Sequence, residues 1–149
     1  MPRRSRAFSL VELIIVLVIL GVITAIAIPR FTKGADGADA TATQADLAVL
    51  RNAIELYKLD HGGTYPTLAN FTAQMTGKSD ADGTPNNATG LYGPYMVSVP
   101  KLKVGANKGN NTVAAPVTVP PVAEVAGAGW LYDAASGSVW ANATGHFDK

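Results

Sequence analysis

Two runs of apolar residues, each with its own spacing, fill the first 60 positions of the chain. In the first run, Phe8 to Ile28, apolar residues occupy nearly every position, so a helix formed there is apolar on all sides. Its 21 residues span roughly 31 Å as a helix, which matches the roughly 30 Å apolar core of a bilayer. We therefore predict a transmembrane helix over residues 8–29. A carboxylate in lipid is costly unless it is paired, which makes Glu12, the ionisable residue in this run, a candidate functional residue.

The second run, from Ala35 to Asp60, has the spacing of an amphipathic helix. Its large apolar residues recur every three or four positions, and charged residues occupy much of the remainder. These positions predict an apolar stripe that packs against a sheet: Leu47, Leu50, Ile54 and Tyr57. The sequence His61-Gly62-Gly63 predicts the end of this helix. The proline and the glycines between residues 29 and 40 leave a break or kink there as an open alternative.

Beyond this helix, the pattern indicates short elements separated by long loops. Residues 67–76 have the spacing of a short helix, and residues 95–99 read as a strand that ends at a proline. Residues 113–125 combine β-branched residues with prolines, which predicts an extended sheet edge or an irregular loop. The segments GWLYD and SVWAN predict a hairpin around a turn at 133–137. The expected fold class is α+β, with a long N-terminal helix packed on a small antiparallel sheet with long loops.

The charge distribution changes once the first seven residues are set apart. The chain has 12 Lys+Arg and 11 Asp+Glu, a formal net charge of +1. Arg3, Arg4 and Arg6 precede the apolar run, and without them 9 basic side chains face 11 acidic ones, so we expect no nucleic-acid partner. Arginines beside a span indicate a cytoplasmic N-terminus with the rest of the chain outside the cytoplasm. The chain has no cysteine, so its exported part is stabilised without a disulfide.

The leader and the start of the apolar run carry a resemblance to a known family. A short basic segment that ends in the small residue Ala7, followed by F-S-L-V-E and then apolar residues, resembles the cleavage and methylation motif of type IV pilins and type II secretion pseudopilins. The resemblance implies that a prepilin peptidase cuts between Ala7 and Phe8 and N-methylates Phe8. It also implies assembly roles for Glu12, Gly21 and Pro29, with the helix loosening between the last two. The family's usual residue before the cut is Gly, and Ala7 departs from it.

A second stretch narrows the resemblance. YKLDHGGTYPT, residues 57–67, is similar to the segment after the long helix in the major pseudopilin of type II secretion. The resemblance implies a leader over 1–7, a transmembrane and filament-core helix over 8–29, and an exported pilin-like domain over 30–149. The implied function is that of a structural subunit that assembles into a short periplasmic filament for protein secretion. Such a subunit is anchored by a single pass in the bacterial inner membrane, with its C-terminal domain in the periplasm or outside the cell.

The resemblance also implies partners: copies of the chain, related pseudopilins, the prepilin peptidase, the inner-membrane assembly platform and the membrane. Two alternatives stay open. Type IV pilins use the same architecture for adhesion, motility or DNA uptake. A membrane-anchored binding module would instead present residues 77–129 to a ligand. Four aromatic residues would then line that site, or else lie in the core: Tyr92, Tyr95, Trp130 and Trp140.

The sequence offers little for catalysis. It has no cysteine nucleophile, no G-x-S-x-G, no H-E-x-x-H and no phosphate loop, so we do not expect an enzyme. His61 falls at a predicted helix end and His146 near the C-terminus, and we expect each to be a surface or capping residue.

Calcium is the one cofactor that the resemblance implies, through an acidic C-terminal loop. The chain departs from that pattern, because after the hairpin only Asp148 is acidic and Asp133 lies in the hairpin turn. Asp80 and Asp82 offer two more carboxylates, but the glycine after them is at the fourth position and not the sixth of an EF-hand loop. These four aspartates are the calcium candidates.

Overall fold

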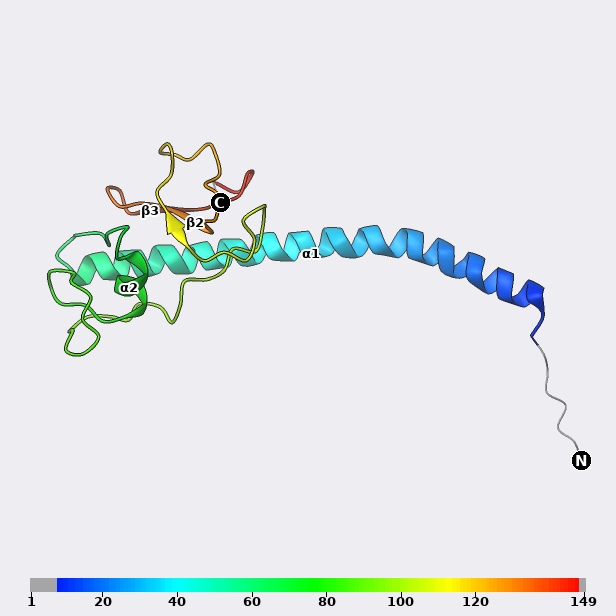
Figure 1. Cartoon of the computed structure of the whole chain (residues 1–149), viewed down its shortest axis with the longest axis horizontal. Helices are drawn as coiled ribbons and strands as arrows, with labels where there is room; N and C mark the ends of the chain where they lie inside the picture. The colour runs from blue at the N-terminus through cyan, green and yellow to red at the C-terminus, as the bar shows by residue number, and fades with distance from the viewer. Residues whose placement is uncertain (1–7, 148–149) are drawn as a thin grey trace, which may run out of the picture. The chain divides into compact units, whose positions relative to one another are not determined.

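A computed structural model describes the backbone of residues 8–147 and the side chains of residues 8–25 and 35–147. The elements in chain order are α1 (Leu10–Asp60), α2 (Phe71–Thr76), β1 (Val113–Ala114), β2 (Trp130–Asp133) and β3 (Ser138–Ala141) (Figure 1). The chain divides into two compact units, Met1–Ala38 and Asp39–Lys149, and α1 contributes residues to both. The predicted α+β class, with a long N-terminal helix and a small sheet, is confirmed.

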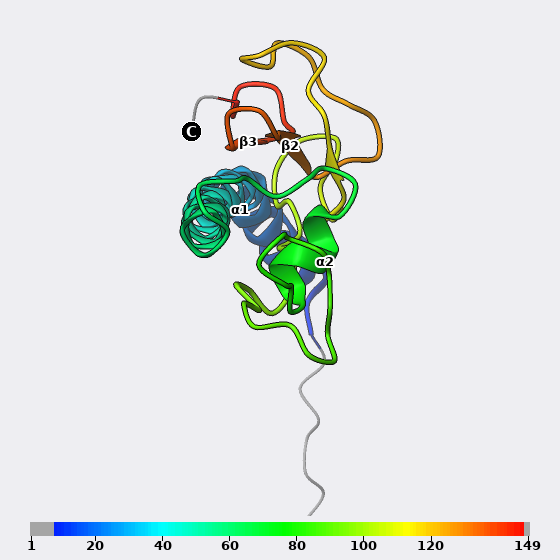
Figure 2. The same ribbon diagram turned by 90° about the vertical axis from the view of Figure 1, so that its left-hand side faces the viewer.

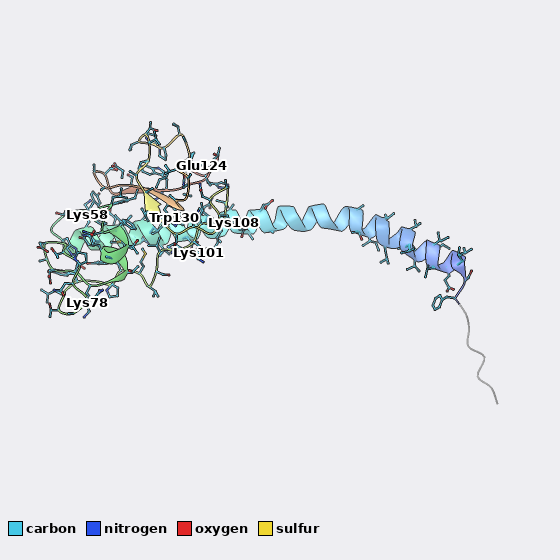
Figure 3. The ribbon with its side chains drawn as sticks, in the orientation of Figure 1. Lys58, Lys78, Lys101, Lys108, Glu124 and Trp130 are labelled. Carbon is cyan, nitrogen blue, oxygen red and sulfur yellow. The ribbon has the colours of Figure 1, made fainter. Side chains whose placement is uncertain are left out.

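The described backbone of the first unit is helical from Leu10 onward, and the side chains drawn along its first turns point outward all around the helix (Figure 3). Every large apolar side chain from Phe8 to Ile23 keeps at least 50% of its surface exposed. Among the helices in the described part of the chain, none carries an apolar stretch of the length needed to cross a membrane. α1 continues through residues 29–40, so the alternative of a break there is wrong.

In the second unit, α1 buries the stripe that the sequence predicts. Leu47, Leu50, Ile54 and Tyr57 each keep 1% or less of their surface exposed. The helix ends at Asp60, where the amide of Gly63 donates a 2.8 Å hydrogen bond to the carbonyl oxygen of Lys58. Gly62 and Gly63 have φ values of 62° and 89°, a left-handed conformation that favours glycine. The predicted helix end is therefore confirmed.

The predicted hairpin is confirmed, with β2 antiparallel to β3 and Trp130 opposite Ala141. The prediction of a purely antiparallel sheet is wrong, because β1 pairs with β2 in parallel, Val113 opposite Trp130. The connection between these strands runs over residues 115–129, which is long enough to bring the chain back in the same direction. The sheet order is β1-β2-β3, so β1 is an edge strand, and it stops two residues before Pro116.

Two further predictions are corrected. Residues 95–99 do not form a strand: the amides of Tyr95 and Met96 both donate to the carbonyl oxygen of Met75, at 2.9 and 3.1 Å. These backbone donors therefore close the end of α2 and are not available to a ladder. The short helix predicted over 67–76 begins later, at Phe71, after a turn.

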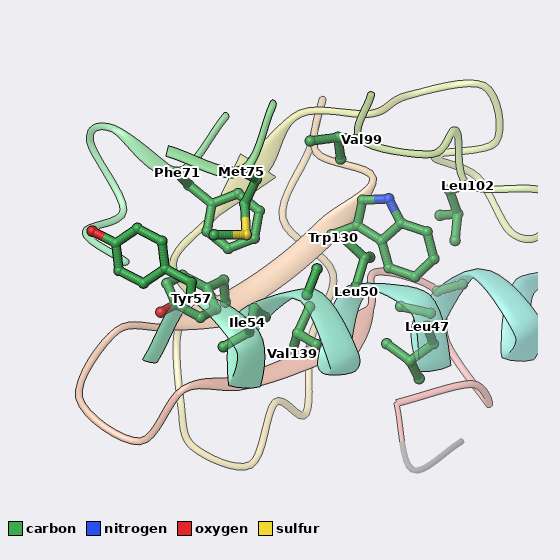
Figure 4. Close-up of a cluster of buried hydrophobic side chains, with 14 of the residues drawn as sticks. Leu47, Leu50, Ile54, Tyr57, Phe71, Met75, Val99, Leu102, Trp130 and Val139 are labelled. Atoms are coloured by element: carbon green, nitrogen blue, oxygen red, sulfur yellow. The ribbon is translucent and has the colours of Figure 1, made fainter. Parts of the chain in front are cut away.

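The core of the second unit lies between its part of α1, the sheet and α2, which surround it on different sides (Figure 2). Trp130 is fully buried, and its Nε1–H donates a 2.7 Å hydrogen bond to the carbonyl oxygen of Pro100. The Tyr132 hydroxyl donates to the carbonyl oxygen of Pro66 at 2.8 Å, and burial raises the pKa of this tyrosine. The close-up in Figure 4 shows the apolar side chains that meet here: Leu47, Leu50, Ile54, Tyr57, Phe71, Met75, Val99, Leu102, Trp130 and Val139.

Candidate assembly site and C-terminal loop

The candidate assembly site lies in the first turns of α1. Glu12 is in the first helical turn. The amide of Leu13 donates a 3.2 Å hydrogen bond to the carbonyl oxygen of Ser9, which lies just before the helix. A carboxylate in this position is favoured by the positive N-terminal end of the helix dipole. Among the side chains that the structure describes, those of residues 8–25 and 35–147, none forms an ion pair or hydrogen bond with the Glu12 carboxylate. This carboxylate is free to accept a cation from another molecule.

The apolar side chains around Glu12 are also exposed. Phe8, the predicted first residue after cleavage, is 80% exposed. At Gly21, no heavy atom lies within 4 Å of the position that a Cβ would take, so another helix can approach closely there. Ala7 and Asp148 lie outside the described residues, as does the side chain of Pro29. Cleavage, methylation and the assembly roles stay predictions.

His61 is a structural residue at the C-terminal end of α1. Its ring is 6% exposed and stacks on Tyr57 with centroids 3.8 Å apart. Its Nδ1 lies 2.8 Å from the Tyr57 carbonyl oxygen and its Nε2 lies 3.0 Å from the Ser79 hydroxyl. The expectation of a surface residue is wrong, while that of a capping residue is confirmed, because a ring nitrogen pairs with a carbonyl of the last helical turn.

The four aromatic residues considered for a ligand site do not come together as one. Trp130 is part of the core, while Tyr95 is half-buried and its hydroxyl donates to Asp60 Oδ2 at 2.9 Å. Burial, together with the hydrogen bond to Asp60, raises the pKa of Tyr95. Trp140 lies on the face of β3 opposite to its buried neighbours Val139 and Ala141. It lines an open pocket of about 370 Å³ with Arg51 and Glu55.

The described calcium candidates do not fit a common metal site. Asp133 accepts hydrogen bonds from the amides of Ala135 and Ser136 and from the Ser136 hydroxyl, which lowers its pKa and closes the hairpin turn. Asp80 accepts two bonds from the Asn86 amide group. No group of three carboxylates or histidines that could hold a metal occurs in the described part of the chain.

Asp82 is held in the same way as Asp80 and Asp133. It accepts a 2.9 Å bond from the amide of Thr84, which lowers the pKa of its carboxyl group. Each described candidate carboxylate therefore already accepts hydrogen bonds from residues of its own loop or turn. Because Asp148 lies outside the described residues, calcium binding stays a prediction without a donor set in this structure.

An amide network that the sequence did not predict fixes the C-terminal loop. The Asn142 side chain is fully buried; its Nδ2–H donates to the carbonyl oxygens of Val125 and Ala128, and its Oδ1 accepts from the Val125 amide at 2.9 Å. Asn107 donates to the Asn142 carbonyl oxygen and to Glu124. These residues join residues 124–128 to the segment after β3 through hydrogen bonds.

Glu124 completes the network. Its Oε1 accepts from the Thr144 amide at 2.6 Å and from the Thr144 hydroxyl at 2.8 Å. These two hydrogen bonds lower the pKa of Glu124. A carboxylate in this loop thus bonds to neutral donors of the protein itself.

Comparison with known proteins agrees with the N-terminal motif. Residues 2–28 match the family described as the prokaryotic N-terminal methylation motif. The chain is 32% identical over 87 residues to the type II secretion system core protein G of Dickeya chrysanthemi, which is 58% of this chain and 56% of that protein. It is also 32% identical over 85 residues to the protein of the same name from Aeromonas hydrophila, 57% of this chain and 59% of the relative.

A third protein of that name, from Klebsiella pneumoniae, is 38% identical over 65 residues, 44% of this chain and 46% of the relative. The chain thus spans about half the length of the curated relatives that it matches. No solved structure matches it. The resemblance to type II secretion pseudopilins, predicted from residues 7–28 and 57–67, is confirmed.

Proposed function

We propose that this chain is a structural pseudopilin subunit that assembles into a short helical filament for type II protein secretion. The observation that carries the proposal is the methylation motif at residues 2–28, which includes the start of α1 and whose large apolar side chains stay exposed from Phe8 to Ile23. Exposed apolar surface of this extent has to be covered by lipid or by other subunits. Similarity to the type II secretion system core protein G of several bacteria supports the secretion role.

The proposal includes an order of events at the N-terminus. The subunit waits in the inner membrane with residues 8–29 as a single-pass anchor and its C-terminal domain in the periplasm. A prepilin peptidase cuts between Ala7 and Phe8 and methylates the new amino terminus. The assembly platform then moves the subunit from lipid into a bundle of the same helices. The sequence has no phosphate loop, so the energy for this movement comes from another protein.

Glu12 has the central part in this mechanism. Its carboxylate faces no cation within the described chain and is costly in lipid. The positive amino terminus of Phe8 on a neighbouring subunit, freed by cleavage, is the partner that assembly supplies. In the apolar interior of a filament, this ion pair fixes the axial register between adjacent helices.

Substitution of Glu12 tests this mechanism. We expect Glu12→Ala and Glu12→Gln to leave cleavage and membrane residence intact. Both variants should reduce filament formation and secretion at least about tenfold, because each of them loses one strong ion pair. Mass measurement of the purified protein reports cleavage, and immunoblots of secreted cargo report function. Asp36→Asn removes an exposed carboxylate of the same helix and serves as the matched control. Normal filaments from both Glu12 variants would remove the register mechanism.

A type IV pilin for adhesion, motility or DNA uptake is the second candidate, because pilins carry the same N-terminal motif. Deletion of the gene separates the two functions. Loss of cargo secretion with surface fibres retained supports the pseudopilin, while loss of long surface fibres with secretion retained supports the pilin.

A further inference from the structure

The strand β3 has an outer edge that no other strand of the described chain covers, because the sheet order is β1-β2-β3. The amide of Asn142 donates to the carbonyl oxygen of Gly129 at 3.0 Å, so these two residues form a hydrogen-bonded pair. Bonded and non-bonded pairs alternate in an antiparallel ladder, so Trp140 belongs to the next bonded pair, and Val139 and Ala141 belong to non-bonded pairs. The backbone groups of Val139 and Ala141 are therefore directed away from β2.

Arg51 occupies part of this edge. Its guanidinium donates to the Val139 carbonyl oxygen at 3.3 Å, which agrees with the direction that the ladder implies. The Ala141 carbonyl oxygen accepts from the amide of Ala143 at 2.9 Å. In the described part of the chain, no group accepts a hydrogen bond from the outward amides of Val139 and Ala141. The edge therefore offers two backbone donors, and one acceptor that a long hydrogen bond occupies.

The open pocket of about 370 Å³ lies along this edge. It is lined by Arg51 and Glu55 of α1 and by consecutive residues of the hairpin, Ser136 to Trp140. Both views show β3 beside the second half of α1 (Figures 1 and 2). Val139 is buried toward the core and Trp140 lies on the opposite face of the strand, so the pocket extends around the edge of β3. A site between an edge strand and a helix is one in which an extended peptide can add as a further strand.

The helix α1 passes β3 in the opposite direction. Arg51 bonds to the middle of β3, and Lys58, two turns later, bonds to Tyr65, whose ring lies against Gly137 at the start of the strand. Glu55 lies between Arg51 and Lys58 along the helix. Helix positions four apart are separated by about 6 Å, and alternate residues of a strand by about 6.6 Å. Side chains two positions apart in an added strand can therefore reach Arg51 and Glu55 in turn.

Neither of these two charges has a close partner of opposite sign. Arg51 forms no ion pair with any carboxylate that the structure describes. The Glu55 side chain is 60% exposed, and its contact with Lys58 is 3.7 Å long, whereas Lys58 bonds to the Tyr65 hydroxyl at 2.8 Å. A purely anionic ligand would be repelled by Glu55. A segment with an acidic and a basic residue two positions apart matches both charges.

We propose that β3 accepts an extended segment of another protein as an additional strand, with an acidic residue at Arg51 and a basic residue two positions away at Glu55. Val139 is only 1% exposed, so the exposed Arg51 side chain leaves its carbonyl oxygen and binds the acidic residue, and the backbone of the segment takes its place. The next residue beyond the acidic one points to the opposite face of the sheet, where an apolar side chain packs on Trp140. This site goes beyond the proposed filament function, since all of its residues belong to the second unit.

The chain does not supply this segment itself. In its sequence, opposite charges two positions apart occur at Lys58–Asp60 and at Lys78–Asp80. The first pair lies in α1. In the second, Ser79 is fully buried, and its amide donates to the Tyr92 carbonyl oxygen at 3.0 Å. Neither segment can extend along β3, so the partner is a different protein.

Binding of labelled peptides to the full-length protein in detergent, followed by fluorescence anisotropy, tests this site. The probes are the peptide TVFDTKTV and its reversed sequence VTKTDFVT, because a strand can add in either direction. We expect one of the two to bind saturably below about 1 mM. The control peptide TVTDKFTV has the same composition with its two charges adjacent. It should bind at least about fivefold more weakly, because adjacent residues of a strand point to opposite faces.

N-methylation of the bound peptide separates strand addition from a contact between side chains alone. Each methyl group removes one backbone donor and leaves the side chains in place. Alternate residues of a strand direct their amides to the same neighbour, so methylation at every second position should weaken binding at least about tenfold. Methylation at the intervening positions should change it less than about twofold. Equal effects at all positions would overturn the added strand.

Exchange of the charges tests the register. On the wild-type protein, the charge-exchanged peptide TVFKTDTV, or its reverse, should bind at least about fivefold more weakly than the original. The double variant Arg51→Glu/Glu55→Arg should prefer the exchanged peptide. Lys101→Glu, at an exposed lysine that forms no ion pair with the carboxylates described here, is the control and should keep the wild-type preference. Equal binding of both peptides to the wild-type protein would overturn the assigned roles of Arg51 and Glu55.

The remaining outcomes separate this site from the proposed function. Absence of saturable binding by either peptide direction overturns the strand-accepting site and leaves the pseudopilin function standing. Self-association of the chain that the peptide competes away would assign the edge of β3 to a second copy, which also overturns the proposal. Normal secretion after deletion of the gene overturns the secretion role and leaves the peptide site to be decided by the binding measurements.

Discussion

α1 is one helix with two different surroundings. Over residues 10–25 its apolar side chains are exposed on every side, and nothing in the described chain covers them. Over residues 39–60 it buries one stripe completely against α2 and the sheet and leaves a second stripe exposed. Burial within the described chain therefore does not stabilise the first part, whereas the second part has its own core.

This difference explains how a subunit can change its surroundings without unfolding. If residues 10–25 leave lipid for a bundle of helices, the core around Leu50, Ile54 and Trp130 is unaffected, because it contains only residues of the second unit. In the proposed mechanism, the part that assembles and the part that stays folded are thus separated along one helix.

A matched pair of isoleucines tests the comparison most strongly. Ile54→Ala should lower the unfolding free energy of the second unit by about 2–5 kcal/mol, because it leaves a cavity in a close-packed core. Ile19→Ala, at an exposed position, should change it by less than about 0.5 kcal/mol. Both tryptophans lie in the second unit, so denaturant unfolding followed by tryptophan fluorescence in detergent reports on that unit alone. Equal effects of the two substitutions would contradict the separation.

Periodicity predicted the parts of the fold that depend on local pattern. The spacing of Leu47, Leu50 and Ile54 is visible in the sequence because all three lie on one helix face. Gly62 and Gly63 predicted the helix end correctly, because few other residues adopt their backbone conformation. The β2–β3 hairpin was predicted for the same reason, since its turn and both of its strands are adjacent in the chain.

The missed features depend on contacts between distant segments. β1 pairs in parallel only after a long connection, which leaves no local pattern. The amides of residues 95 and 96 are taken by Met75, some 20 positions earlier, so an alternating apolar segment did not become a strand. Asn142 was indistinguishable from other loop asparagines, because its partners Val125 and Ala128 lie on another segment. The N-terminal motif was located from the sequence, but the partner proposed for Glu12 belongs to another molecule.

The amide network gives a second test, with a smaller effect than the core cavity. Asn142→Asp keeps the shape of the side chain but cannot donate to the carbonyl oxygens of Val125 and Ala128, so we expect a loss of about 1–3 kcal/mol. The same change at exposed Asn111 is the control. If the loop depends on this network, the loss should appear in tryptophan-monitored unfolding while the helical signal of residues 10–25 in detergent is unchanged. A loss of helix in both units would show that they are coupled.

The smallest expected effect is a dependence of stability on acid that belongs to the second unit alone. Hydrogen bonds from Thr144 lower the pKa of Glu124, and those from Ser136 lower that of Asp133. A carboxyl group whose pKa is lower in the folded than in the unfolded state adds stability above its ordinary pKa of about 4, and this contribution disappears as the pH falls through the folded value. We therefore expect the unfolding free energy of the second unit to be constant from pH 7 to about pH 5 and to fall at lower pH. In Glu124→Gln, which cannot titrate, the fall should be shallower, while the helical signal of residues 10–25 in detergent should not follow it. An unchanged slope in Glu124→Gln would show that the Thr144 bonds do not contribute to acid sensitivity, and a gain of stability in acid would reverse the proposed sign.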